Sequence, residues 1–201
     1  MKFGGSQPEF SPTSYFACLQ EMLQQQLNTN NTSIEALMYA YSAIVSMLDS
    51  GVVANQEKKI VEAATFVVQS GRYSPSAVKY SVMCLQFVLG TKSVAQWQSQ
   101  DDSSGPILSL IFSQALSTHQ SVFQQAVKTL CIILQNNTIS AIPKVQALLK
   151  QFIDGTVMSV LGSQQRNANT NQVEVGAQQQ AVKLLNFLSG VLQLLPVDLC
   201  A

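Results

Sequence analysis

Charge is what this sequence of 201 residues has least of. Charged residues make up 11% of it, against roughly 25% in an average soluble domain. The 11 basic and 11 acidic residues leave no net charge, which argues against a strongly basic nucleic-acid surface but leaves room for a local patch. Hydrophobic residues reach 47%, enough for a sizeable core. Because charged residues are few, solubility must depend on uncharged polar groups such as the 25 glutamines.

Residues that carry out chemistry are also scarce. The single histidine, His119, has no metal-ligating or catalytic partner near it in the sequence, so we expect it to serve a turn or helix cap. The only paired carboxylates, Asp101 and Asp102, lie in a Ser/Gly-rich stretch that is typical of a solvated loop. No phosphate-binding loop, nucleophile elbow or zinc spacing is present. The sequence therefore predicts a protein that is not an enzyme, with no catalytic residue, metal site, cofactor or small-molecule substrate.

The four cysteines, Cys18, Cys84, Cys131 and Cys200, are far apart, and none forms a Cys-x-x-Cys motif. The first three lie in apolar runs with helical spacing, where a free cysteine acts as a small buried hydrophobic residue. We expect reduced structural thiols and a reducing, intracellular compartment.

Long hydrophobic runs are missing too. The most apolar stretch, from Leu184 to Leu195, is interrupted by Asn186, Ser189 and Gln193, whereas a membrane-spanning helix needs about 20 apolar residues. The N-terminus has no apolar segment of signal-peptide length. We expect a soluble protein that does not enter a membrane.

The tripeptide Ala-Val-Lys occurs three times, at residues 77–79, 126–128 and 181–183. Each copy opens an apolar run with helical spacing, and a degenerate fourth copy begins at Ala36. The copies recur at intervals close to the roughly 40–47 residues of HEAT and armadillo repeats. Apolar residues recur at three and four positions instead of alternating, which excludes strands. The pattern predicts an all-α protein, an α-solenoid of about four HEAT- or armadillo-like helix pairs.

Start and stop signals give approximate bounds for these helices. We predict helices over about residues 12–27, 33–50, 56–70, 75–89, 106–116, 120–136, 142–161 and 174–195, with one short turn at 94–98. The predicted starts are Ser11-Pro12, Thr32 with Glu35 as a capping box, Asn55, Ser74-Pro75 and Pro106, and the predicted stops are Gly51, Gly71, Gly90 and Pro196. Gly155 is a predicted weak point or kink.

The domain organisation follows from these bounds. Residues 1–10 are predicted to be a flexible end, and residues 11–201 a continuous HEAT-like segment with mobile loops near 99–105 and 163–173. The chain stops at Ala201 without a polar capping repeat, which a solenoid needs at its ends. We expect a part of a longer repeat protein.

The Ala-Val-Lys copies fall in the second helix of each predicted pair, and so does the degenerate copy. A buried alanine there lets paired helices approach closely, and the lysine two positions later is rotated by about 200° around the axis. Lys79, Lys128 and Lys183 would then form a ladder of positive charge for an acidic partner or for RNA phosphates, unless they are ordinary surface lysines. Trp97 is either an exposed aromatic contact or an aromatic that packs between two repeats.

One order of segments is shared with a known family: it runs through residues 11–17, 33–36, 94–97 and 119–134 and closes with Leu194-Leu195-Pro196. In these segments the chain resembles the N-terminal HEAT-repeat region of the ribosomal RNA-processing protein 12 (RRP12-like) family. The resemblance implies a non-enzymatic scaffold in pre-rRNA processing and in the export of pre-ribosomal particles. Its partners would be pre-ribosomal proteins, pre-rRNA and the nuclear transport machinery, in the nucleus and nucleolus with shuttling to the cytoplasm. The alternatives are an importin- or armadillo-type transport adaptor and a regulatory subunit of an enzyme complex.

Overall fold

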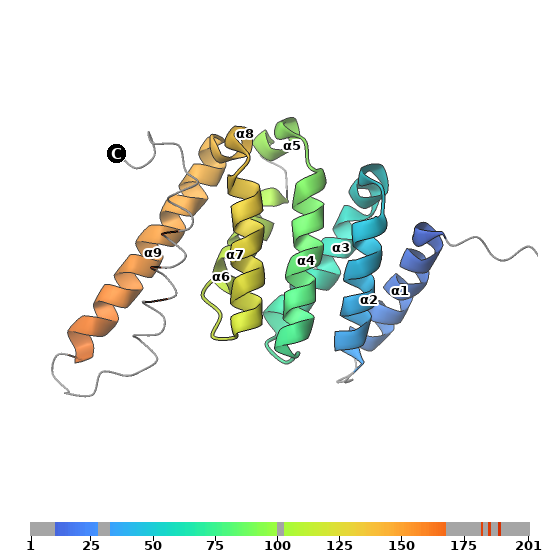
Figure 1. Cartoon of the computed structure of the whole chain (residues 1–201), viewed down its shortest axis with the longest axis horizontal. Coiled ribbons are helices and arrows are strands. Elements are labelled where there is room, and N and C mark those ends of the chain that lie inside the picture. The colour runs from blue at the N-terminus through green and yellow to red at the C-terminus, as the bar shows by residue number, and fades with distance from the viewer. Residues whose placement is uncertain are drawn as a thin grey trace, which may run out of the picture. The chain divides into compact units, whose positions relative to one another are not determined.

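The computed structural model describes residues 11–27, 33–99 and 103–167, together with Val182, Leu185 and Ser189; among these, the side chains of Asn137 and residues 156–167 are not described. The described residues form nine helices and no strand (Figure 1), which confirms the predicted all-α solenoid class. Backbone contacts divide the chain into two compact units, Met1–Phe87 and Val88–Ala201. Each unit is described by itself below.

The first unit contains α1 (Pro12–Leu27), α2 (Ile34–Met47), α3 (Ser50–Ser70) and the part of α4 (Pro75–Thr91) that precedes Val88. α1 packs along α2 and also contacts α3, which confirms the pairing of the first two helices. In Figure 1, α3 lies behind α2 and α4. Both Ser-Pro starts are confirmed: the Ser11 carbonyl accepts from the amides of the first turn of α1, and the Ser74 hydroxyl accepts from the Ala77 amide at 3.2 Å.

The junction between α2 and α3 differs from the prediction. α2 ends at Met47, and α3 begins at Ser50, so Gly51 and Asn55 lie inside α3 and neither stops nor caps a helix. The break occurs instead at Leu48 and Asp49, whose ψ angles of 144° and 148° are extended. A glycine inside a helix costs only about 1 kcal/mol, which packing of the rest of α3 outweighs.

The other predicted glycine stops have different outcomes. Gly71 ends α3 with a φ of 66°, the left-handed conformation that glycine adopts without a Cβ clash. Gly90, in contrast, lies inside α4, which continues to Thr91. Thr32 of the predicted capping box lies outside the described residues, and the Glu35 carboxylate accepts a hydrogen bond of 2.6 Å from the Ser74 hydroxyl.

A polar pair lies in the core of the first unit. The Tyr41 hydroxyl of α2 donates to the side-chain oxygen of Gln20 in α1, and both side chains are buried. The Phe16 ring stacks on Tyr41 with centroids 5.3 Å apart. Burial, with a smaller contribution from Cys84, raises the pKa of Tyr41, so its hydroxyl keeps its proton and donates. Because α1 turns Phe16 and Gln20 inward, Tyr15 and Met22 lie toward solvent and are 52% and 45% exposed.

The second unit contains α5 (Val94–Gln98), α6 (Ser104–Gln114), α7 (Gln120–Leu134), α8 (Asn137–Ser140) and α9 (Pro143–Asn167). α6 contacts α7, as predicted for the fifth and sixth helices, and it also contacts α9. The short α8 contacts α5, α7 and α9 (Figure 1). The sequence did not predict α8, which begins where the Asn136 side-chain oxygen accepts from the Thr138 amide at 3.1 Å.

Two predicted loops are shorter than expected. α6 begins at Ser104, before Pro106, and both Ser104 and Gly105 are buried, so they do not belong to a mobile loop. A Cβ at Gly105 would lie 2.8 Å from Cε of Lys144 in α9. The missing side chain thus leaves room for that lysine to cross the start of α6. α9 continues through Gly155 to Asn167, inside the predicted 163–173 loop, whose remainder lies outside the described residues.

The eighth predicted helix is described only at Val182, Leu185 and Ser189, which are helical and exposed. The predicted flexible end at residues 1–10 and the Pro196 stop lie outside the described residues. Within the part of the chain that the structure describes, no helix is both long enough and apolar enough to cross a bilayer.

Candidate interaction surface

Two of the three Ala-Val-Lys copies lie within the described residues. Ala77 of α4 and Ala126 of α7 are 1% and 0% exposed, which confirms the predicted buried alanines. Two positions later, Lys79 is half-buried and Lys128 is exposed. Lys79 belongs to the first unit and Lys128 to the second, and Lys183 lies outside the described residues. The ladder of three lysines therefore stays a prediction.

The prediction of a buried alanine in the degenerate copy, which lies in α2, is wrong. Ala36, its expected buried alanine, is exposed, and so is Tyr39, whose exposed fraction is 59%. The buried positions of α2 are Ile34, Met38, Tyr41, Ser42 and Val45. These larger side chains set the rotation of the helix because burying them removes more apolar area from water than burying an alanine would.

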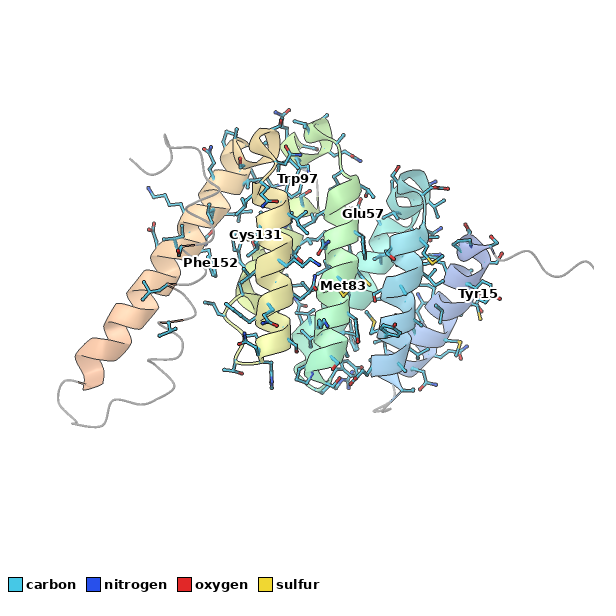
Figure 2. The ribbon with its side chains drawn as sticks, viewed as in Figure 1. Tyr15, Glu57, Met83, Trp97, Cys131 and Phe152 are labelled. Carbon is cyan, nitrogen blue, oxygen red and sulfur yellow. The ribbon has the colours of Figure 1, made fainter. Side chains whose placement is uncertain are left out.

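An exposed aromatic contact joins α2 to α4 in the first unit. The Tyr39 and Tyr80 rings meet edge to face, with centroids 5.2 Å apart and an interplanar angle of 62°. Nζ of Lys79 lies 5.5 Å from the centroid of the Tyr80 ring, a cation–π distance. Met83, one turn after Lys79 on α4, is also partly exposed (Figure 2). This surface therefore presents aromatic rings, a thioether and a single positive charge.

Trp97 lies on α5, where a capping box fixes the helix start. The Ser93 hydroxyl accepts from the Gln96 amide, and the Gln96 side chain accepts from the Ser93 amide at 2.8 Å. The tryptophan side chain is only 1% exposed, which contradicts the hypothesis of an exposed aromatic contact and supports the packing interpretation. Its indole Nε1–H has no hydrogen-bond acceptor among the described residues.

Arg72, just after the end of α3, belongs to a cluster of side chains that the sequence did not predict. Its guanidinium carbon lies 5.3 Å from the ring centroids of both Phe66 and Tyr73. Nη2 of Arg72 donates to the Leu27 carbonyl at 3.3 Å, and the Tyr73 hydroxyl donates to the same oxygen at 2.9 Å. These bonds satisfy a carbonyl at the end of α1 that the helix cannot satisfy itself.

The left-handed turn at Gly71 directs Arg72 and Tyr73 away from the course of α3, which is how they reach α1. A shallow pocket of about 400 Å³ lies beside the cluster, lined by Phe66, Gln69, Ser70 and Arg72. The sequence offered one signal for it: an arginine directly after the glycine that ends a helix, with aromatic residues at positions 66 and 73.

The residues considered for chemistry are dispersed. His119 is exposed and precedes the first residue of α7 as its N-cap, without a side-chain capping bond, in agreement with its predicted place at the helix start. Asp101 and Asp102 lie outside the described residues. Among the side chains that the structure describes, no three His, Cys, Asp or Glu residues are grouped so that they could hold a metal ion.

The cysteines differ in burial more than the sequence predicted. Cys84 is buried, Cys131 is half-buried, and Cys18 is exposed, so the expectation of a buried thiol at Cys18 is wrong. Loss of hydration raises the pKa of the Cys84 thiol, and a smaller degree of burial also raises the pKa of Cys131. Both thiols are therefore weaker nucleophiles than an exposed cysteine.

Comparisons with known proteins agree with this architecture. The family model described as "RRP12-like, N-terminal HEAT repeats" matches residues 6–199, almost the whole chain. No curated protein and no solved structure shows significant similarity. The helical repeats and the extent of the family match lead to one conclusion: the chain belongs to the RRP12-like family, as its N-terminal HEAT-repeat region.

Proposed function

We propose that this chain is a non-enzymatic scaffold in ribosome biogenesis that binds protein components of pre-ribosomal particles in the nucleus and nucleolus. The observation that carries the proposal is the RRP12-like family match over residues 6–199. Helical repeats support a scaffolding role because a stack of helix pairs presents a broad side-chain surface. In this proposal the scaffold takes part both in pre-rRNA processing and in the export of pre-ribosomal particles.

The exposed surface of α2 and α4, the second helices of the first two predicted pairs, favours protein partners. In the first unit, the exposed contact of α2 and α4 consists of Tyr39, Tyr80 and one cation, Lys79. Aromatic residues are enriched at protein interfaces, whereas RNA affinity depends on several basic residues that neutralise successive phosphates. Contact of this surface with pre-rRNA would then be secondary to binding of an acidic protein, for which Lys79, Lys128 and Lys183 remain the proposed contacts.

Affinity purification of the tagged full-length protein from growing cells tests the function. We expect pre-ribosomal proteins and pre-rRNA to be enriched over a mock purification. Recovery of transport cargo without pre-ribosomal particles would instead support an importin-type adaptor. A stoichiometric catalytic subunit without such particles would support a regulatory subunit, and either outcome would overturn the proposal.

The proposed lysine contacts are tested by changing Lys79, Lys128 and Lys183 to glutamate together. Exposed charge pairs contribute only up to about 1 kcal/mol each, so we expect the triple variant to lose particle association several-fold while circular dichroism stays unchanged. The matched control changes three other lysines to glutamate, namely the exposed Lys58, Lys59 and Lys150. An equal loss in the control would show that net charge matters and that the three positions do not.

A further inference from the structure

We propose that the pocket lined by Phe66, Gln69, Ser70 and Arg72, called here the Arg72 pocket, binds the carboxylate of an acidic peptide segment that carries an apolar side chain next to the acidic one. The proposal concerns a direct binding activity of the first unit and does not depend on a role in ribosome biogenesis. Three features carry it: a fixed arginine, an exposed aromatic ring beside it, and the charge around the pocket.

The guanidinium of Arg72 is held in place before any ligand arrives. The ring centroids of Phe66 and Tyr73 both lie 5.3 Å from its guanidinium carbon, and one N–H donates to the Leu27 carbonyl. An arginine has five N–H donors, so most of them are left for a ligand. Because the side chain is already ordered, a bidentate bond with a carboxylate loses less conformational entropy than a bond to a free arginine would.

Arg72 also has no opposite charge of its own. Its side chain is exposed, and within the described ranges no carboxylate lies at ion-pair distance from it. The carboxylate of Glu62, on α3, lies 3.9 Å from Nζ of Lys58. A carboxylate supplied by a partner would therefore form an ion pair without having to displace an existing one.

The rest of the pocket suits the apolar part of a peptide. The Phe66 ring is 38% exposed and offers an aromatic surface beside the charge. The Gln69 side chain is exposed, and the Ser70 hydroxyl donates to the Val67 carbonyl at 3.1 Å, which leaves its oxygen free to accept. Peptide amide groups can thus bond to Gln69 and Ser70 while a neighbouring apolar side chain covers Phe66.

An RNA ligand fits the pocket less well. Among the described residues that line it, Arg72 is the only basic one, and nucleic-acid affinity grows with the number of phosphates neutralised. Glu62, one helical turn before Phe66, is paired with Lys58, so these two residues together add no net positive charge for further phosphates. The balance of charge therefore favours a single carboxylate.

The test is a nuclear magnetic resonance titration of the complete 201-residue chain with two blocked tripeptides, N-acetyl-Phe-Glu-Leu-amide and N-acetyl-Phe-Gln-Leu-amide. We expect the glutamate peptide to shift the Nε–Hε resonance of Arg72 and the side-chain amide of Gln69, with millimolar affinity for so small a probe. The glutamine peptide should bind about tenfold more weakly because it lacks the charge-assisted bidentate bond. Equal binding of both peptides, or no shift with either, would overturn the proposal.

Variants locate the effect. Arg72→Lys keeps the charge and can still donate to Leu27, so the fold should survive, but it loses the bidentate geometry and most of the preference for glutamate. Phe66→Leu should weaken the binding of both peptides to the same extent. The control Lys150→Gln removes one exposed charge in the other unit and should change nothing. A short oligouridylate is the competing probe, and if it shifts Arg72 more strongly than the glutamate peptide does, the pocket is a nucleic-acid site and the proposal is wrong.

Discussion

α2 differs from α4 and α7 in what it buries at its repeat position. In α4 and α7 the alanine of Ala-Val-Lys is buried, whereas in α2 the corresponding Ala36 is exposed and Met38 is fully buried. The identical Ala-Val-Lys copies in α4 and α7 thus predicted the buried face of their helices correctly. The degenerate copy in α2, which matches only in spacing, did not. The reason is that each helix rotates to bury its largest apolar side chains, and α2 has larger ones out of phase with its alanine.

α2 and α7 each bury a polar side chain, and the hydrogen bonds that these two side chains form are of different kinds. α2 contributes Tyr41, which bonds to Gln20 across the α1–α2 contact. In α7 the buried Thr129 hydroxyl donates to the Gln125 carbonyl of its own helix at 2.8 Å. The Tyr41 bond joins two helices and therefore restricts how they pack, whereas this Thr129 bond lies within α7.

The largest effect should come from the buried methionine of α2. Met38 is 0% exposed and Met47, in the last turn of the same helix, is 54% exposed. Replacing a buried methionine by alanine removes contacts and leaves a cavity, so Met38→Ala should lower the free energy of unfolding by about 2–5 kcal/mol. Met47→Ala is the matched control and should change it by no more than about 0.5 kcal/mol in urea denaturation. Equal losses would show that the rotation of α2 described here is wrong.

A smaller effect should separate the alanines. Ala126→Leu forces extra volume into a closed contact of α7, which typically costs about 1–3 kcal/mol. Ala36→Leu places the same side chain on the exposed face of α2 and should alter stability by less than about 0.5 kcal/mol. Thermal or chemical unfolding of the two variants measures the difference. If Ala36→Leu proved the more damaging, the degenerate copy would be a true structural repeat after all.

The smallest expected difference is between the thiols of α4 and α7. It is measured as their rates of labelling in the unsubstituted protein. Cys84 follows Ala77 by two full turns and shares its buried face, while Cys131 lies on a different side of α7 from Ala126 and is half-buried. A maleimide reagent near neutral pH should label native Cys131 faster than Cys84. Because burial raises the pKa of both thiols, raising the pH should speed native labelling of Cys131, while labelling of Cys84 should still require unfolding. Rapid native labelling of Cys84 would contradict its burial.

Helix ends were predictable where one residue dictates the backbone. Pro12 and Pro75 start helices, and Gly71 ends one with a positive φ, because each acts through its own φ angle or missing N–H. Gly51 and Asn55 misled the prediction because their preferences are weaker than the packing of α3 around them. The four-residue α8 was missed because so short a helix has no apolar periodicity to detect.

The candidate site was less predictable than the fold. The sequence led to Lys79, which is half-buried, to Lys128, which is exposed, and to Trp97, which is buried. Binding by the two lysines stays a prediction. The sequence did not lead to Arg72, because a single arginine in a turn has no distinguishing pattern until the aromatic rings around it are known.

The sequence by itself determined the helical class, the repeat family and those helix ends that depend on one or two neighbouring residues, because helical hydrogen bonds join groups only four positions apart. Tertiary structure alone decided which face of α2 is buried, that Tyr41 bonds to Gln20, and that Arg72 reaches the Leu27 carbonyl. These last contacts join residues from different helices, and they form only after the helices have packed, when desolvation makes an unsatisfied buried group costly.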